Sequence, residues 1–226
     1  MAQSGLHAAL GYQFRRIIPY ERRLFPSVIF GAILPDLDIL IVAIGSFFYP
    51  ILESEKLFHR SFSHSFFTVI LVYLLFLIIA EIKKRPIFKS IGKGLAIGIL
   101  SHIILDTFFW FRAIQFLWPL PLEAFNLWSF WESPIWIQRI MLILEFICFR
   151  WYAWFLIKKH LQTPNAHSWI IKYLHIWKKW QTFFIVFFSL LSLWNPTIFL
   201  VLFSIAYIPS IIMALYTTYL SRNALE

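Results

Sequence analysis

The sequence predicts an all-α membrane protein: a polytopic bundle of about six transmembrane helices, with a short N-terminal helix and an interfacial amphipathic helix. Three observations lead to this prediction. Hydrophobic residues make up 60% of the 226 residues and charged residues only 14%, whereas soluble domains carry about 25% charged residues. Long apolar runs recur along the chain and match the length of membrane helices. The basic residues gather at the ends of these runs, as the positive-inside rule describes.

The expected elements begin with an apolar helix over residues 4–14, which is too short to cross a bilayer. The first long run covers residues 24–48 and contains Pro35. Because proline disfavours helical geometry in the residue before it, this run is expected to form a broken helix, with Asp36 at the start of its second half. Irregular backbone within a membrane is tolerated only where protein or water surrounds it. The broken helix therefore indicates a site rather than a simple anchor.

The remaining elements are further apolar runs joined by polar or aromatic connections. These runs are expected at residues 66–82, 94–111, 134–157, 182–194 and 197–220. Residues 166–180 carry tryptophan and tyrosine at helical spacing with basic residues on another face, a pattern typical of an interfacial amphipathic helix. Asn195 and Pro196 separate the last two runs and favour a tight membrane hairpin.

No internal repeat or low-complexity linker divides the chain, so residues 1–226 are expected to form one membrane-embedded domain. Residues 1–120 carry the motifs, and residues 134–226 add membrane helices. The net charge of +9 does not indicate a nucleic-acid partner, because the basic residues flank apolar runs. The expected partner is the lipid bilayer.

The positions of lysine and arginine predict the topology. With the N-terminus inside, 15 basic residues fall in inner connections: Arg15, Arg16, Arg22, Arg23, Lys83, Lys84, Arg85, Lys89, Lys93, Lys158, Lys159, Lys172, Lys178, Lys179 and Arg222. Only 3 fall in outer connections: Lys56, Arg60 and Arg112. This bias predicts six crossings with both ends in the cytoplasm.

Ionisable residues within the apolar surroundings form a candidate site. An ionised aspartate at the centre of a membrane helix costs about 2.5 to 3.5 kcal/mol. The three aspartates of the chain nevertheless all lie in apolar stretches: Asp36, Asp38 and Asp106. His102 is four residues before Asp106, so both can face one ion from a helix. His59 and His64 precede the second run on the same expected side, and the three segments converge on one depth.

Imidazole and carboxylate ligands together suit zinc, manganese or iron. With His7 near the N-terminus, seven candidate side chains exceed one tetrahedral shell, so two ions and one ion with supporting residues both fit. Each residue alone is equally compatible with a hydrogen bond between membrane helices. The cluster favours a divalent metal, which would neutralise the carboxylates.

The motifs resemble those of a known family. His7 is followed by Gly31–Asp38 (GAILPDLD), His59–Ser65 (HRSFSHS) and Ser101–Asp106 (SHIILD). This order resembles the YdjM-like membrane-bound metal-dependent hydrolases of bacteria and archaea, whose pattern is an N-terminal His, PD-x-D, HRG-x-THS and GH/SH-x-x-x-D. The likeness covers about residues 5–120 and includes Leu117-Trp118-Pro119. Ser61 replaces the glycine and Ser63 the threonine of HRG-x-THS.

The resemblance implies an integral protein of the prokaryotic inner membrane with a metal cofactor. The family is also distantly similar to zinc-dependent phospholipases C in its His/Asp arrangement, which implies zinc and hydrolysis of a phosphoester or ester on a lipid-linked or interfacial substrate. The expected metal ligands are His7, Asp36, His64, His102 and Asp106. Asp38 or His59 is expected to act as general base or further ligand, and Arg60 to bind an anionic group such as phosphate.

Two alternatives remain open. Membrane aspartate and histidine also line ion or proton pathways, and the broken helix at Pro35 resembles the discontinuous helices of transporters. A non-catalytic protein with a structural metal is the second alternative. A serine hydrolase is disfavoured because no GxSxG motif is found.

The predicted topology conflicts with one proposed ligand. His7 precedes the first basic flank, which places it on the cytoplasmic side, away from the other ligands. Three explanations are possible: residues 4–14 insert as a re-entrant helix, the topology is wrong, or His7 is not a ligand.

Overall fold

The computed structural model describes residues 4–111, 113–128, 130–163 and 168–226, and these ranges are helical without a β-strand. The predicted membrane helical bundle is confirmed. The helices are α1 (Ser4–Gln13), α2 (Leu24–Ile33), α3 (Asp38–Gly45), α4 (Ile51–Phe58), α5 (Phe66–Lys83), α6 (Ile87–Phe109), α7 (Ile135–Gln162), α8 (Ser168–Trp194) and α9 (Pro196–Leu220), with 3₁₀ turns η1 (Phe14–Arg16), η2 (Leu34–Leu37) and η3 (Phe62–His64). Arg112 and residues 166 and 167 lie outside the described ranges.

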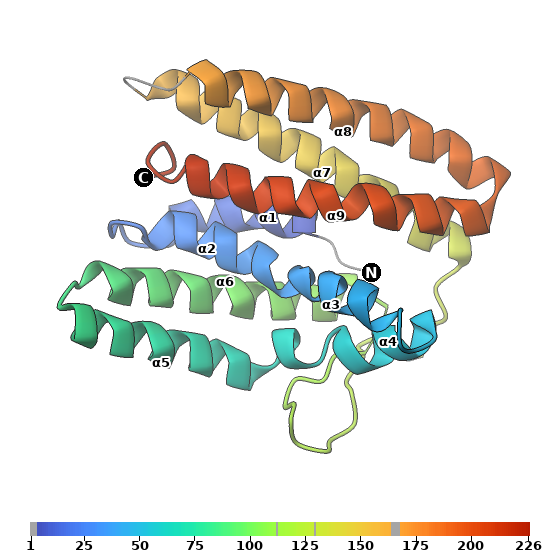
Figure 1. Ribbon diagram of the computed structural model, residues 1–226, viewed down its shortest axis with the longest axis horizontal. Helices are drawn as coiled ribbons and strands as arrows, with labels where there is room; N and C mark the ends of the chain where they lie inside the picture. Colours follow the sequence, from blue (N-terminus) through green and yellow to red (C-terminus); the bar gives the residue numbers. More distant parts are fainter. Residues whose placement is uncertain (1–3, 112, 129, 164–167) are drawn as a thin grey trace.

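Five segments are long and apolar enough to cross a membrane: Leu24–Gly45, α5, α6, α7 and Ile198–Leu220. They run side by side along the long axis of the bundle (Figure 1). The connections before α2, between α5 and α6 and between α7 and α8 lie at one end, on the left in Figure 1, and hold most of the basic residues. We call this the basic end. Its cytoplasmic orientation stays a prediction.

The amphipathic segment and the fifth apolar run differ from expectation, because they form one continuous helix, α8. No helix-breaking residue separates them: Gln181 at the junction is buried and donates a hydrogen bond from Nε2 to Ser210 Oγ of α9 at 3.1 Å. α8 is therefore packed on α7 and α9 rather than detached at the interface. Its lysines keep it out of the five segments that qualify as membrane spans by composition. α8 and α9 form the predicted hairpin at Asn195 (Figure 1).

The first span is interrupted as Pro35 predicts. The α-helix α2 ends at Ile33, η2 follows, and α3 begins at Asp38. The interruption is milder than expected, because Leu34 keeps right-handed helical dihedrals (φ −56°, ψ −42°). Proline lacks the N–H group that an α-helix requires, and the chain changes to 3₁₀ geometry instead of unwinding. Asp36 lies in η2, at the point of interruption.

Glycines allow α2 and α6 to pack with their backbones in contact. A Cβ atom on Gly31 would overlap the backbone of Leu95, and one on Gly98 would overlap the carbonyl oxygen of Val28. Gly94 and Gly98 have the GxxxG spacing that lets membrane helices approach closely. This contact brings the third predicted motif, on α6, against the first, which follows α2.

The helix α1 lies inside the bundle, packed on α7 and α2 (Figure 1). Its residues Gly5, Ala8 and Gly11 are buried. It begins midway along the bundle, and the chain reaches the basic end at η1. The arrangement is that of a re-entrant helix, the first of the three explanations considered for His7.

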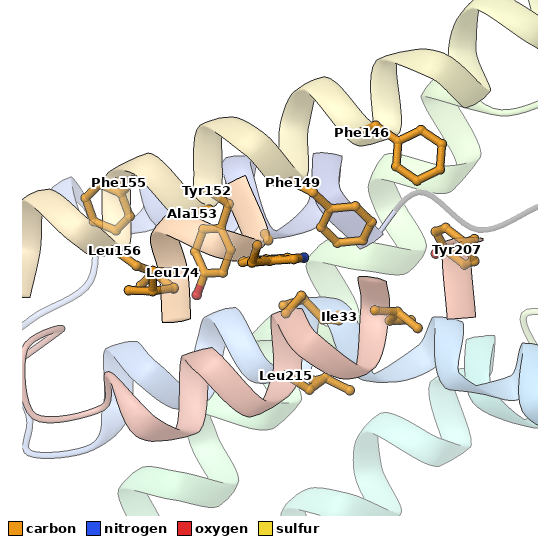
Figure 2. Packing of buried hydrophobic residues seen from close by; sticks show 14 of the residues in the cluster. Ile33, Phe146, Phe149, Tyr152, Ala153, Phe155, Leu156, Leu174, Tyr207 and Leu215 are labelled. Atoms are coloured by element: carbon orange, nitrogen blue, oxygen red, sulfur yellow. The ribbon is translucent and has the colours of Figure 1, made fainter. Parts of the chain in front are cut away.

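Aromatic side chains fill the core between α7, α8 and α9. Phe149 and Tyr152 project from α7 among the buried residues, and Tyr207 and Leu215 belong to the same cluster (Figure 2). The hydroxyl of Tyr152 lies 2.7 Å from Thr218 Oγ1 of α9, so its polar group is satisfied within the core. This packing fixes α7 and α9, which supply residues around the candidate site.

Candidate metal centre

Two histidines from different elements point their Nε2 atoms at each other. His64 follows the turn η3 and His102 lies on α6; both are fully buried, and their Nε2 atoms are 3.0 Å apart. His102 Nδ1 donates to the carbonyl oxygen of Ala32 at 2.8 Å. This bond leaves Nε2 of His102 as the atom with a free lone pair, the arrangement found in metal-binding histidines.

His64 is oriented by a relay of hydrogen bonds. Ser63 Oγ donates to Asp38 Oδ2 at 2.6 Å, so it accepts from His64 Nδ1 at 2.8 Å. The ring of His64 therefore directs Nε2 toward His102. Two nitrogen lone pairs facing each other repel unless a positive charge lies between them, and a proton or a metal ion satisfies that requirement.

Two carboxylates complete this cluster. Asp36 Oδ1 lies 3.6 Å from His102 Nε2, and it accepts no hydrogen bond from the described residues although it is buried. Asp106 Oδ2 lies 3.6 Å from His64 Nε2 and 3.9 Å from His102 Nε2. Ligands of a tetrahedral ion at about 2.1 Å are separated by about 3.4 Å. The four side chains thus have the spacing of a tetrahedral metal site.

His7 joins the site from the buried helix α1. Its Nε2 lies 3.0 Å from Asp106 Oδ1, and its ring stacks on His102 with centroids 3.7 Å apart. His7, His102 and Asp106 form one group with the spacing of metal ligands, and Asp36, His64 and His102 form another. All five residues that the sequence predicts as metal ligands are therefore brought together.

Asp38 has a different environment from Asp36. Besides Ser63, it accepts hydrogen bonds from His59 Nδ1 at 2.7 Å and from the backbone N–H of Arg60 at 3.2 Å. These bonds occupy both of its oxygens. Asp38 therefore joins the residues of the second motif rather than lying among the four facing ligand atoms.

Arg60 connects the site to its surroundings. Its Nη2 lies 2.9 Å from Asp106 Oδ2, and its guanidinium lies over the ring of Trp110 at 5.4 Å from the centroid. Arg60 has a positive φ of 62°, a conformation that L-residues other than glycine seldom adopt. The family pattern places glycine directly after this arginine; here the left-handed residue is the arginine itself.

Three residues that sequence reasoning missed support α1 and the site. Ser4 Oγ donates to Asp36 Oδ2 at 2.7 Å and lies 2.7 Å from the hydroxyl of Tyr207 on α9. Glu145 of α7 accepts hydrogen bonds from the backbone N–H groups of Gly5 at 2.5 Å and Leu6 at 3.3 Å. A carboxylate at a helix N-terminus satisfies N–H groups that have no partner within the helix. The acidic residue in the apolar fourth run was visible in the sequence, but its partner was not.

A comparison with protein families matches residues 2–219 to the description YdjM inner membrane protein. The chain belongs to this family. It is an integral inner membrane protein, as the sequence predicted. Comparisons with curated proteins and with solved structures found no match.

In this YdjM family protein, two histidines outside the spans have shifted pKa values. Burial lowers the pKa of His59 to about 4, against the opposing effect of Asp38. Burial also lowers the pKa of His64, but hydrogen bonding to Asp106 and Asp38 outweighs it and raises the pKa to about 9. The carboxylates thus attract positive charge to His64, and a metal ion binding there would displace a proton. The donor set fits a divalent metal.

Proposed function

We propose that this YdjM family protein is a metal-dependent hydrolase of the inner membrane. The observation that carries the proposal is the set of four buried ligand atoms with tetrahedral spacing. They belong to Asp36, His64, His102 and Asp106. Zinc suits this mixture of imidazole and carboxylate, and manganese or iron is the alternative. His7 orients Asp106 through its 3.0 Å contact and is a further ligand if coordination expands.

A bound divalent metal supplies a Lewis acid and lowers the pKa of water to about 7. The pair Asp38 and His59 is suited to proton transfer. Asp38 accepts from His59 Nδ1, so Nε2 of that ring keeps its lone pair, and this buried atom has no partner among the described residues. A carboxylate that orients a histidine in this way is a common arrangement for a general base. Arg60 provides positive charge beside Asp106, where an anionic substrate group would be stabilised.

The substrate class is a lipid-linked or interfacial phosphoester or ester. Two features support this class. The ligands lie in or next to membrane-spanning segments, so a membrane lipid reaches them more readily than a soluble molecule does. The resemblance of the motifs to zinc-dependent phospholipases C favours a phosphoester.

A structural metal is the second candidate function. Zinc sites with four protein ligands are usually structural, and catalytic sites keep one position for water. The four ligand side chains are at most 1% exposed, which favours this alternative. The interruption of the first span at η2 also suits an ion pathway. These candidates predict metal without hydrolysis, or metal-dependent uptake without hydrolysis.

The test combines elemental analysis of the purified protein with a screen of phospholipid and phosphoester substrates. We expect stoichiometric metal and a hydrolytic activity that are lost together in His102→Ala and Asp106→Asn. His175→Ala is the matched control, because His175 is exposed on α8. Purified protein without stoichiometric transition metal would contradict the proposal. Metal without hydrolysis of any substrate in the screen would favour the structural site, and metal-dependent uptake into proteoliposomes would favour transport.

A further inference from the structure

A cavity of about 390 Å³ lies between the end of α6 and the start of α7, away from the basic end. The residues that define its character are Trp110, Phe111, Trp128, Trp131, Glu132 and Gln138. Because α6 and α7 are membrane spans, the cavity lies where the hydrocarbon layer gives way to lipid headgroups. No residue of the predicted site lines it.

Three aromatic rings around the cavity are inclined to one another. Phe111 is 5.3 Å from Trp131 at an interplanar angle of 78°, and 6.1 Å from Trp128 at 64°. Trp128 and Trp131 are 6.0 Å apart at 61°. Tryptophans of an interfacial belt present their rings to lipid, whereas these rings face one another around a hollow. Such boxes bind quaternary and other ammonium groups through the negative faces of the rings.

The polar groups of the cavity favour a cation too. The amide nitrogens are used within the protein: Asn126 Nδ2 donates to Phe111 O at 2.8 Å and Gln138 Nε2 to Ser133 O at 3.0 Å. Glu132, by contrast, has no ion pair or hydrogen bond within the described ranges. The cavity therefore offers a free carboxylate beside aromatic faces. A sugar would need several donors and acceptors, whereas an ammonium group needs only acceptors and rings.

We infer that this aromatic cavity binds the ammonium headgroup of a phospholipid. Its level at the membrane surface favours a lipid over a free amine. Trp110 joins the cavity to the candidate metal centre, since its backbone N–H donates to Asp106 O at 3.1 Å and Arg60 lies over its ring. A zwitterionic lipid held here by its ammonium group brings its phosphodiester toward the positive charge of Arg60. Only the naming of this lipid as substrate rests on the proposed function.

Binding is tested with the full-length protein in detergent. The probes are short-chain phosphatidylcholine, phosphatidylethanolamine and phosphatidylglycerol, with free choline as competitor, and native mass spectrometry measures the bound lipid. We expect the two ammonium lipids to bind about tenfold more tightly than phosphatidylglycerol. Glu132→Gln should remove this preference. Glu123→Gln is the matched control, since Glu123 is an exposed carboxylate in the same loop outside the cavity.

Each outcome decides the inference. Equal binding of the three lipids, or a preference that survives in Glu132→Gln, would overturn it, and so would free choline binding as tightly as phosphatidylcholine. Trp131→Ala should also lose the preference, because it removes one wall of the box. A selective cavity in a protein that hydrolyses nothing would contradict the proposed function alone. Hydrolysis without headgroup preference would contradict the cavity assignment alone.

Discussion

The ring of His102 donates a hydrogen bond to the carbonyl oxygen of Ala32, 70 positions earlier in the chain, at 2.8 Å. A side chain of one membrane helix reaches the backbone of another only where the two helices almost touch. Gly31 and Gly98 provide that approach. The orientation of His102 Nε2 therefore depends on helix packing as well as on the neighbouring ligands.

We expect Gly98→Ala to destabilise the protein and weaken its metal site. The added methyl would overlap Val28 O and lie 2.6 Å from Ala32 N, and overpacking of this kind costs about 1–3 kcal/mol. Unfolding in mixed micelles and metal affinity measure the two effects. Gly11→Ala is the matched control, since its methyl would meet no atom closer than 3.5 Å. Equal stability of the two variants would contradict the role of the α2–α6 contact.

Asp38→Asn should reduce metal affinity by about 10- to 100-fold, the range for residues that orient ligands. The reason is that Asp38 holds His64 through Ser63 and does not itself face His102. Competition with a chelator of known affinity measures this loss. Asp106→Asn should lose stoichiometric metal altogether, so the two variants separate an orienting carboxylate from a ligating one. Identical metal loss in both would assign Asp38 to the metal instead.

The sequence predicted the membrane helices, the interruption at Pro35 and the residues that converge, because each depends on composition or on local spacing. His102 and Asp106 are four residues apart, so their common direction follows from helix geometry alone. The position of His7 was not predictable, since the basic flank at Arg15 placed it on the cytoplasmic side. What holds α1 inside the bundle is a contact with Glu145, 140 positions away, and no local pattern encodes such a contact.

The continuous helix α8 illustrates a second limit. Lysines before residue 180 and apolar residues after it gave two patterns, and the sequence was divided where the pattern changed. Hydropathy changes at that point, but the backbone does not, because Gln181 is compatible with a helix and its amide finds Ser210. Composition thus predicted the environment of each half correctly as different, while helix continuity depended on a partner in α9.

Glu145→Ala should release α1. The N–H groups of Gly5 and Leu6 would lose their acceptor in a buried setting, which costs about 1–3 kcal/mol for each unsatisfied group. Hydrogen–deuterium exchange over residues 4–13 should accelerate, and metal affinity should fall because His7 belongs to the same helix. Glu145→Gln keeps an acceptor oxygen and should show a smaller change. Unchanged exchange in Glu145→Ala would show that packing against α7 alone holds α1.

Tyr207→Phe should weaken the metal site without disturbing the core. The ring of Tyr207 stacks on Phe203 with centroids 5.6 Å apart, and phenylalanine preserves that contact. The hydroxyl lies 2.7 Å from Ser4 Oγ, which donates to Asp36 Oδ2, so its removal lets Asp36 turn away from His102. We expect about a tenfold loss of metal affinity with unfolding in mixed micelles nearly unchanged. Tyr219→Phe is the matched control, because Tyr219 is 56% exposed on the same helix. If both variants bind metal as the unmodified protein does, Ser4 alone suffices to position Asp36.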